Sequence, residues 1–441
     1  MGESLETIES IAPHLRRAEG SAWFEPIPLG ANLPRRAVTA NAEFARHYAH
    51  EYTHFLQSAT TFWGANRMHT FFWSISDLSK ALRAANGNLV DLDVEKFRAE
   101  LRKKQAALAL ISKIDLNEDV EGPMFTDAPL VGFQVLDMDD GRMPTFCRTY
   151  PGRGTLVTPI SVVALEESMA MAVESWMDPE GTQRIYSFAC ALPNWQAFKY
   201  VVVQEALGDI APHWDVATIR WMTVLICDVA LNQYLPTFAF IMIMRELRSR
   251  THVSTPMLID VATLHRQLTA ACHMETAEEA RIGLLEELTR VAARPGSDSA
   301  PFDHIFATYL GVFIEAMQVR ANRPHAFVER LLTLSGSVAD DLRRFEAIPF
   351  YSTRKELISA LPDAELATAG LGMICLQDFT RALMKTAPLS ALRTRCPLFD
   401  QSGTCEYTKG QHCESTPWLA PITDGYSCIY RAATDAVGVL G

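Results

Sequence analysis

The segment His50-Glu51-Tyr52-Thr53-His54 carries two histidines and a glutamate at a spacing suited to metal-dependent hydrolysis. Two histidines four residues apart on a helix project from one face, so both imidazoles can reach one ion. Zinc accepts imidazole ligands and lowers the pKa of a bound water from about 16 to about 7. Glu51 is placed to take a proton from that water and later return it. The segment predicts a catalytic zinc site with ligands His50 and His54 and the general base Glu51.

A catalytic zinc site also needs a third protein ligand and an open position for water. The apolar stretch at residues 162–176, VVALEESMAMAVESW, carries the adjacent pair Glu166 and Glu167. Carboxylates are costly to bury on an apolar helix unless they are paired or bind a metal. One of these two glutamates is therefore the candidate third ligand.

The HEYTH segment, together with the run from Ala164 to Ala170, resembles the gluzincin group of zinc metallopeptidases. That group adds a glutamate from a later helix in a pattern such as E-x-x-A. The resemblance implies that Glu167, with Ala170 three residues later, is the third ligand, and that the chain is a zinc-dependent peptidase. It covers only two short motifs. The gap of 112 residues between His54 and Glu167 is long for the group, so the intervening segments would be an insertion.

Two further side chains are candidates for orienting the zinc ligands. Glu174 lies seven residues after Glu167 and shares its helix face, so its carboxylate could hold a ligand histidine. His47 lies one turn before His50 on nearly the same face, as a supporting residue or even a ligand. Glu166 is a candidate for the same supporting role if Glu167 is the ligand.

A peptidase also needs a donor that stabilises the oxyanion of the tetrahedral intermediate. The spacing does not choose among the candidates, which are Tyr186, Tyr200, His213 and Tyr234. An edge strand of a predicted hairpin at 130–150 could pair with an extended peptide substrate through main-chain hydrogen bonds. The expected partner is a protein or peptide substrate.

Two other functions remain open at this point. Glu51-x-x-His54 is half of a di-iron signature, so the chain could be a helical non-haem iron oxidase or oxygenase that also uses Glu167 and Glu174. A two-iron bundle normally needs a second Glu-x-x-His, and the chain has none. A non-catalytic, metal-stabilised interaction protein is the third alternative.

The C-terminal region carries a second possible metal site. Four cysteines, with His412 among them, fall within 33 residues: Cys396, Cys405, Cys413 and Cys428. Four soft ligands suit a structural zinc ion or an iron–sulfur cluster. The spacing contains no CxxC pair, so free thiols and disulfides remain alternatives.

Helical periodicity dominates the chain and predicts a mainly α fold with a small β-hairpin or sheet element and a zincin-like helical metal site. The segment 293–303 is rich in Pro, Gly, Ser and Asp and predicts a linker. It would separate a metal-binding catalytic domain at 1–292 from a helical C-terminal domain at 304–441. The elements expected to place the motifs are a helix at 41–63, a helix at 93–113, the hairpin at 130–150, a helix at 160–177 and a Cys-rich tail at 393–430.

Charge and composition narrow the classes of partner. A net charge of −12 and the absence of a basic run argue against nucleic acid. The apolar run at 221–244 includes Asp228, Asn232, Gln233 and Pro236, so it predicts two buried helices that meet near Pro236 instead of a membrane span. The polar N-terminus lacks the apolar core of a secretory signal, and nine cysteines, an odd number, indicate reduced thiols in a cytoplasm.

Overall fold

The computed structural model describes residues 23–25, 30–32, 42–89, 92–93, 95–99, 124–127, 130–138, 141–192, 195–249, 260–272, 276–292, 300–333, 350–352, 357–359, 364–385, 392–398, 411–420 and 428–439. It is mostly helical with a small antiparallel sheet, which confirms the predicted fold class. The first half contains the helices α3 (Ala42–Thr60), α4 (Phe62–Ala84), α6 (Val162–Met177), α7 (Pro179–Ala191), α8 (Trp195–Phe198), α9 (Val202–Ile210), α10 (Val216–Leu231) and α11 (Pro236–Ser249). The second half contains α12 (Val261–Ala271), α13 (Thr276–Ala292), α14 (Ala300–Asn322), α15 (Ala326–Leu332), α17 (Ala364–Lys385), α18 (Gln411–Ser415), a short 3-10 turn at Pro417–Leu419, and α19 (Ile429–Ala436). Of the predicted helix at 93–113, the structure describes a helical segment at 95–99, and the part after residue 99 lies outside the described residues.

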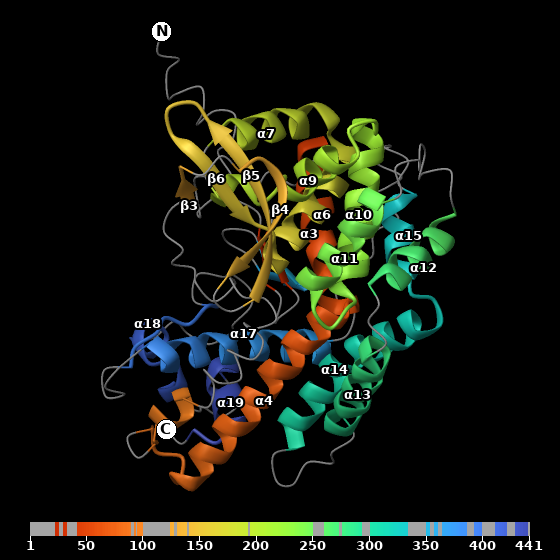
Figure 1. Cartoon of the computed structure of the whole chain (residues 1–441). Coiled ribbons are helices and arrows are strands. Elements are labelled where there is room, and N and C mark those ends of the chain that lie inside the picture. Colours follow the sequence, from red (N-terminus) through yellow and green to blue (C-terminus); the bar gives the residue numbers. More distant parts are fainter. Residues whose placement is uncertain are drawn as a thin grey trace.

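The predicted hairpin is present and belongs to a four-stranded antiparallel sheet. Its strands β4 (Gly132–Met138) and β5 (Gly141–Tyr150) pair with Phe133 opposite Phe146. The strands β6 (Gly154–Pro159) and β3 (Met124–Thr126) complete the order β3-β6-β5-β4. Figure 1 shows this sheet along one flank of the helices, with β4 next to α11. β6 leads almost directly into α6, so the sheet positions the start of the helix that carries the glutamates.

The structure contains a second sheet that the sequence analysis does not predict. It joins β1 (Trp23–Glu25) and β2 (Gly30–Asn32) to β7 (Phe350–Ser352) and β8 (Leu357–Ser359), with β2 and β7 parallel. Each of these strands has only three residues, too short for an alternating pattern to be recognised. The first two strands contact α3.

The helix that carries HEYTH ends earlier than the predicted position 63, at a sharp junction with α4. Thr61 adopts an extended backbone, and its side chain caps α4 by accepting a hydrogen bond from the Gly64 N–H at 3.0 Å. A Cβ on Gly64 would lie 2.1 Å from the Ser58 carbonyl oxygen. The two helices can therefore turn this tightly only because residue 64 is glycine.

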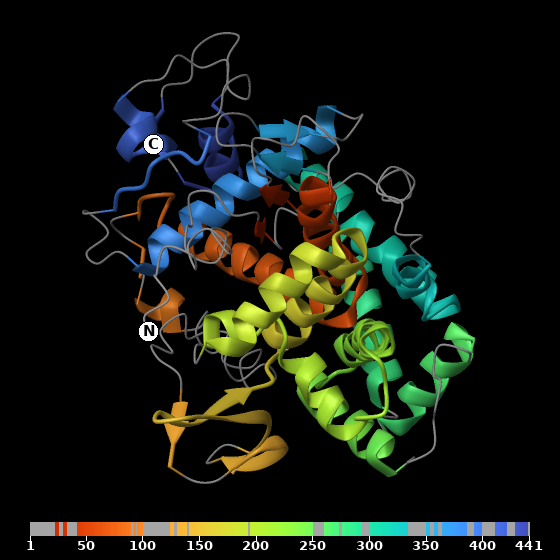
Figure 2. The same cartoon turned by 90° about the horizontal axis from the view of Figure 1, so that it is seen from above.

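The central layer consists of α3 packed against α6, with α10 on another side of α6 and α14 also contacting α3. In Figures 1 and 2, α3 runs through the middle of the molecule with α6 and α10 beside it. The N-cap Ser161 accepts a hydrogen bond from the Ala164 N–H at 3.2 Å and fixes where α6 begins. The two predicted metal-binding motifs are thus brought together by direct helix packing.

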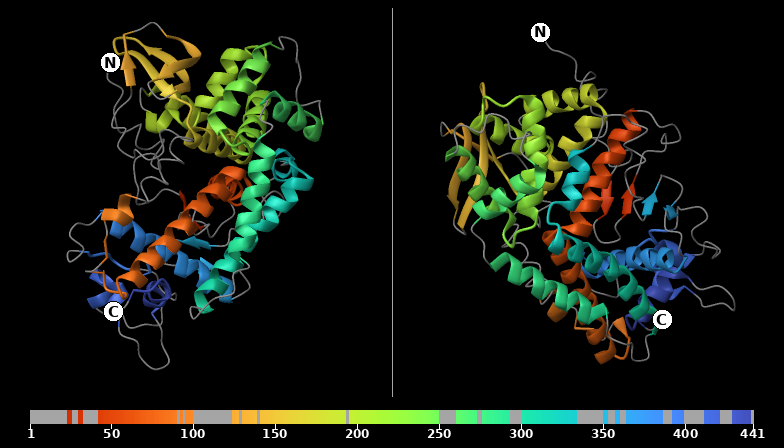
Figure 3. Two further views of the ribbon diagram at one scale, coloured as in Figure 1. Left: turned by 60° about the horizontal axis from the view of Figure 1, so that its bottom comes forward. Right: turned by 90° about the vertical axis from the view of Figure 1, so that its right-hand side faces the viewer.

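The C-terminal helices α14, α17 and α19 pack against one another, and Figure 3 shows them on the side of the molecule away from the antiparallel sheet. Their buried apolar side chains belong to the same contiguous core as those of α3, α6 and α10. Residues 293–299 of the predicted linker lie outside the described residues, and 300–303 already belong to α14. The division into two domains remains a prediction.

The apolar run at 221–244 forms two helices, α10 and α11, separated by a short break that ends at Pro236, as predicted. Proline fits the first turn of a helix because its missing N–H is not needed there. Within the described part of the chain, no helix combines the length and the apolar character needed to cross a bilayer.

Candidate metal centre

His50, His54 and Glu167 converge where α3 packs against α6. The Nε2 atoms of His50 and His54 lie 3.2 Å apart, and each lies 3.4 Å from Oε2 of Glu167. Within the residues that the structure describes, no other set of three His, Cys, Asp or Glu side chains has potential ligand atoms all within 4.8 Å of one another. The helix packing therefore creates one compact triangle of metal-ligand atoms.

The size of this triangle fits a tetrahedral zinc ion. With zinc–ligand bonds of about 2.0–2.1 Å, two ligand atoms of a tetrahedral site lie about 3.3 Å apart. Adjacent ligands of an octahedral ion at the same bond length would lie about 2.9 Å apart. The observed 3.2, 3.4 and 3.4 Å match the tetrahedral value.

The other nitrogen of each imidazole is held by a hydrogen bond. Nδ1 of His50 lies 2.8 Å from Oε2 of Glu174, and Nδ1 of His54 lies 2.7 Å from Oε1 of Gln57. Gln57 is oriented in turn because its amide nitrogen donates to the Glu166 carbonyl at 2.9 Å. Both partners of the rings are acceptors, so Nδ1 is the donor in each bond and Nε2 is the nitrogen that faces the triangle. This arrangement is typical of histidines that bind a metal.

The triangle favours a positive charge at its centre. Two imidazole Nε2 atoms and a carboxylate oxygen face one another, and the buried Oε2 of Glu167 has no hydrogen-bond partner. Burial alone would lower the pKa of His50, but Glu167 and Glu174 outweigh it and raise that pKa well above its usual value. Burial would raise the pKa of Glu167, yet Lys199 and the two histidines hold it well below its usual range. The donor atoms and the local charge both fit a zinc ion.

Glu51 is almost fully buried beside the triangle, with 1% of its surface exposed, and its Oε2 has no hydrogen-bond partner. Burial raises the pKa of Glu51 to about 7, although the two histidines act in the opposite direction. A carboxylate with a pKa near neutrality can accept a proton and release it again. Its position and environment suit the predicted general base.

The structure separates the two adjacent glutamates. Glu166 turns to Arg67, whose Nη2 lies 2.8 and 3.1 Å from its two carboxylate oxygens, while Glu167 points to the histidines. His47 is not part of the triangle, and its Nε2 lies 3.4 Å from Nη2 of Arg46. Arg46 also pairs with Glu174, with Nε 3.3 Å from Oε1.

Among the four candidate oxyanion donors, Tyr200 is the one beside the triangle. Its ring lies 6.1 Å from the ring of His50. Burial and the charge of Glu167 raise the pKa of Tyr200, so the hydroxyl keeps its proton and remains a donor. Tyr186 donates to Glu205 instead, while the rings of His213 and Tyr234 contact Trp214 and Phe62.

The edge of the hairpin is partly occupied. The N–H of Phe133 in β4 points away from β5 and donates to Oδ2 of Asp209 at 3.0 Å. This part of β4 does not offer a free row of main-chain groups to a peptide. Strand pairing with a substrate remains a prediction for the rest of the strand.

In the predicted cysteine site, Cys396, Cys413 and Cys428 are buried, and Cys405 lies outside the described residues. The backbone N–H of Cys396 donates to the Cys413 carbonyl at 2.7 Å, and none of the three thiols forms a disulfide within the described residues. They do not form a compact ligand group within the described residues. A metal or cluster in the tail remains a prediction.

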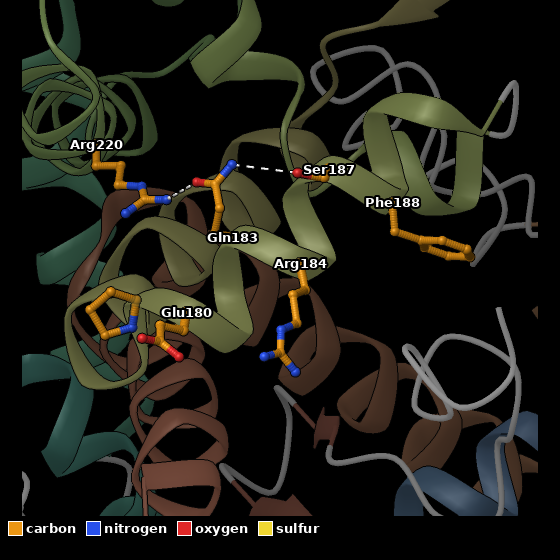
Figure 4. Close-up of a pocket in the computed structure, with 7 residues that line it drawn as sticks. Glu180, Gln183, Arg184, Ser187, Phe188 and Arg220 are labelled. Carbon is orange, nitrogen blue, oxygen red and sulfur yellow. Dashed lines mark hydrogen bonds between the residues drawn. The ribbon is translucent and has the colours of Figure 1, made fainter. Parts of the chain in front are cut away.

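A separate hollow of about 820 Å³ lies along α7 (Figure 4). Figure 4 shows Arg220 reaching Gln183, whose amide faces Ser187, and Arg184 pointing away from them. The hollow is wide and open, and none of its lining residues belongs to the triangle. Its chemistry is therefore not that of the metal centre.

No protein-family model, curated protein or solved structure matches the chain. The function of the chain must therefore be argued from its own site.

Sequence reasoning missed two residues of this centre. Gln57 lies three positions after His54 on α3, so helical spacing could have placed it on the same face. Lys199 binds Glu167 from a turn 32 residues further along the chain, and no local signal indicates that contact.

Proposed function

We propose that this protein is a zinc-dependent hydrolase, most specifically a peptidase. The observation that supports the proposal best is the triangle of His50, His54 and Glu167, whose edges of 3.2–3.4 Å match a tetrahedral zinc site with one corner free for water. Glu51 adds a buried carboxylate with an unpartnered oxygen beside it.

His50, His54 and Glu167 would hold the ion, which when bound lowers the pKa of water and polarises a carbonyl group. Glu51 accepts a proton from the attacking water and delivers it to the leaving amine. Glu174 and Gln57 keep the two imidazoles in the tautomer that presents Nε2 to the ion. Tyr200, with its proton retained, is the neighbouring donor best placed to stabilise the oxyanion.

The first test is metal content. Purified protein is expected to hold one zinc ion per chain. Glu167→Ala should lose it, while the matched variant Glu166→Ala should keep it, because Glu166 pairs with Arg67. Zinc that survives in Glu167→Ala would contradict the ligand assignment.

The second test concerns the base. Glu51→Gln keeps the shape of the side chain and should retain zinc, but hydrolysis of unfolded casein or of a quenched peptide library should fall by at least about 10²-fold. A variant that cleaves as fast as the wild type would contradict the role of Glu51.

A mononuclear iron enzyme is the second candidate, because two histidines and one carboxylate are also the donor set of non-haem iron oxygenases. The tetrahedral spacing and the buried base favour zinc. Reconstitution with iron(II) under anaerobic conditions, compared with zinc in direct competition, distinguishes the two. Preferential retention of iron would move the proposal to oxidation.

A further inference from the structure

The three glutamates of α6 each have a cationic partner, and they differ in what their second carboxylate oxygen contacts. Arg67 takes both oxygens of Glu166. Glu174 uses one oxygen for Arg46 and the other for His50. Only the third pair leaves an oxygen over.

That third pair is Lys199 with Glu167. Nζ of Lys199 lies 2.9 Å from Oε1 of Glu167, and Oε2, the oxygen that faces the histidines, has no hydrogen-bond partner. The side chains of Lys199 and Glu167 are only 17% and 15% exposed. One carboxylate oxygen of Glu167 therefore contacts the ammonium group, and the other faces the position that a metal ion would occupy.

The backbone holds Lys199 in this position. Lys199 lies in the turn between α8 and α9, and its carbonyl accepts a hydrogen bond from the hydroxyl of Ser168 at 3.0 Å. The N–H of Val203 donates to the same hydroxyl at 3.4 Å. Because Ser168 directly follows Glu167, the turn and the ligand are joined at the same point of α6. The ammonium group also lies 5.0 Å from the ring centre of Tyr200, whose face favours a cation.

We propose that Lys199 is a positioning residue that makes Glu167 a one-oxygen metal ligand and thereby keeps the fourth corner of the ion open for water. This inference rests on the proposed zinc site. A carboxylate without the lysine can turn both oxygens to the ion and occupy two coordination positions. A lysine suits the task because it is a point donor that engages one oxygen, whereas the flat guanidinium group of arginine tends to engage both.

The test uses cobalt(II) as a substitute for zinc in the full-length protein. Four-coordinate cobalt(II) absorbs visible light several-fold more strongly than five-coordinate cobalt(II). Lys199→Met is expected to reduce this absorption several-fold, because the second oxygen of Glu167 then raises the coordination number. The control Arg67→Met removes the cation of the neighbouring Glu166 and should leave the spectrum unchanged. A wild-type spectrum in Lys199→Met, or an equal change in Arg67→Met, overturns the proposal.

Lys199→Arg keeps the positive charge and serves as a control in case Lys199→Met changes the spectrum because the protein unfolds. If the lysine only neutralises Glu167, Lys199→Arg should restore the spectrum. The proposal expects no rescue, because arginine competes for the second oxygen. Wild-type behaviour of Lys199→Arg therefore contradicts positioning by a single donor. If the wild-type protein binds neither cobalt nor zinc, that result contradicts the proposed function itself and is distinct from a failure of the Lys199 proposal.

Discussion

Two buried clusters of charged side chains lie along α3, and they handle their charge in different ways. The candidate metal centre is near the middle of the helix. The other cluster is near its end, where Asp228 of α10 and Arg320 of α14 form a pair with two short contacts of 2.8 and 3.1 Å. Nη2 of Arg320 also donates to the hydroxyl of Thr60, the last residue of α3, at 2.9 Å. Nε2 of His265 lies 3.4 Å from the same carboxylate.

The difference lies in which atoms are left without partners. In the Asp228 cluster these are two nitrogens, Nε of Arg320 and Nε2 of His265, and both carboxylate oxygens are satisfied. At the metal centre they include carboxylate oxygens of Glu51 and Glu167. The chain supplies its own cation in one cluster, and in the other it leaves ligand atoms directed at a common point. Burial of charge alone therefore does not identify a candidate metal site, whereas ligand atoms that converge with an unpartnered oxygen among them do.

The largest expected effect breaks the metal centre alone. His54→Ala should reduce zinc affinity by at least about 10³-fold, because it removes one of the three protein ligands that together supply the free energy of zinc binding. Titration with a zinc-sensitive dye in competition measures this loss. The control His47→Ala changes a histidine on the same helix that lies outside the triangle and should bind zinc as the wild type does. Equal losses in both variants would contradict the ligand set.

The next effect breaks the other cluster alone. Asp228→Asn leaves Arg320, which is only 2% exposed, without its counter-charge, and should destabilise the fold by about 3–5 kcal/mol. Urea unfolding followed by circular dichroism measures the change. Zinc affinity should stay within about 3-fold of the wild type, because Asp228 contacts no ligand. A large loss of zinc binding in a folded Asp228→Asn protein would show that the clusters are not independent.

The sequence predicted the residues that form the triangle and missed the contacts around them, and it did not predict the Asp228 cluster. His50, Glu51 and His54 follow from spacing on one helix. The charged pair on an apolar helix indicated Glu166 or Glu167, and the resemblance to an E-x-x-A pattern favoured Glu167. Helical spacing near Pro236 also indicated that α10 and α11 are separate buried helices. These inferences needed no knowledge of what packs against each helix.

The missed contacts join segments far apart in the chain. Arg320 lies 92 residues from Asp228, and nothing near either residue indicates the other. Lys199 reads as an ordinary surface lysine until the turn after α8 is placed against α6. The mixed sheet of β1, β2, β7 and β8 depends on pairing between the two ends of the chain. All three of these contacts depend on tertiary packing, which the local sequence around each residue does not indicate.

Acid should act on the Asp228 cluster in a defined direction. Burial would raise the pKa of Asp228, but Arg320 and His265 outweigh it and lower that pKa below its usual value near 4. The stabilisation is fully present above the pKa of the unfolded chain and is lost as the pH falls through the lower folded pKa. Urea midpoints measured at pH 6, 4 and 3 should fall less steeply in Asp228→Asn than in the wild type. Parallel curves would contradict an ionised Asp228.

The smallest expected effect concerns the residue that links α3 to the Asp228 cluster. Thr60→Val keeps the shape of the side chain but removes the hydroxyl that accepts from Arg320 at 2.9 Å and donates to the Leu56 carbonyl. A hydrogen bond to a charged group contributes about 1.5–3 kcal/mol, so the loss should lie near the lower end of that range, because Arg320 keeps Asp228 and the Pro324 carbonyl. Urea unfolding measures the loss, with Thr70→Val as the control, because the hydroxyl of Thr70 donates to the Asn66 carbonyl within its own helix. Thr60 lies more than a turn beyond His54 on α3. An unchanged zinc affinity in Thr60→Val would show that the end of α3 can be loosened without disturbing the ligands. A weakened zinc affinity would show that the Asp228 cluster holds α3 in place.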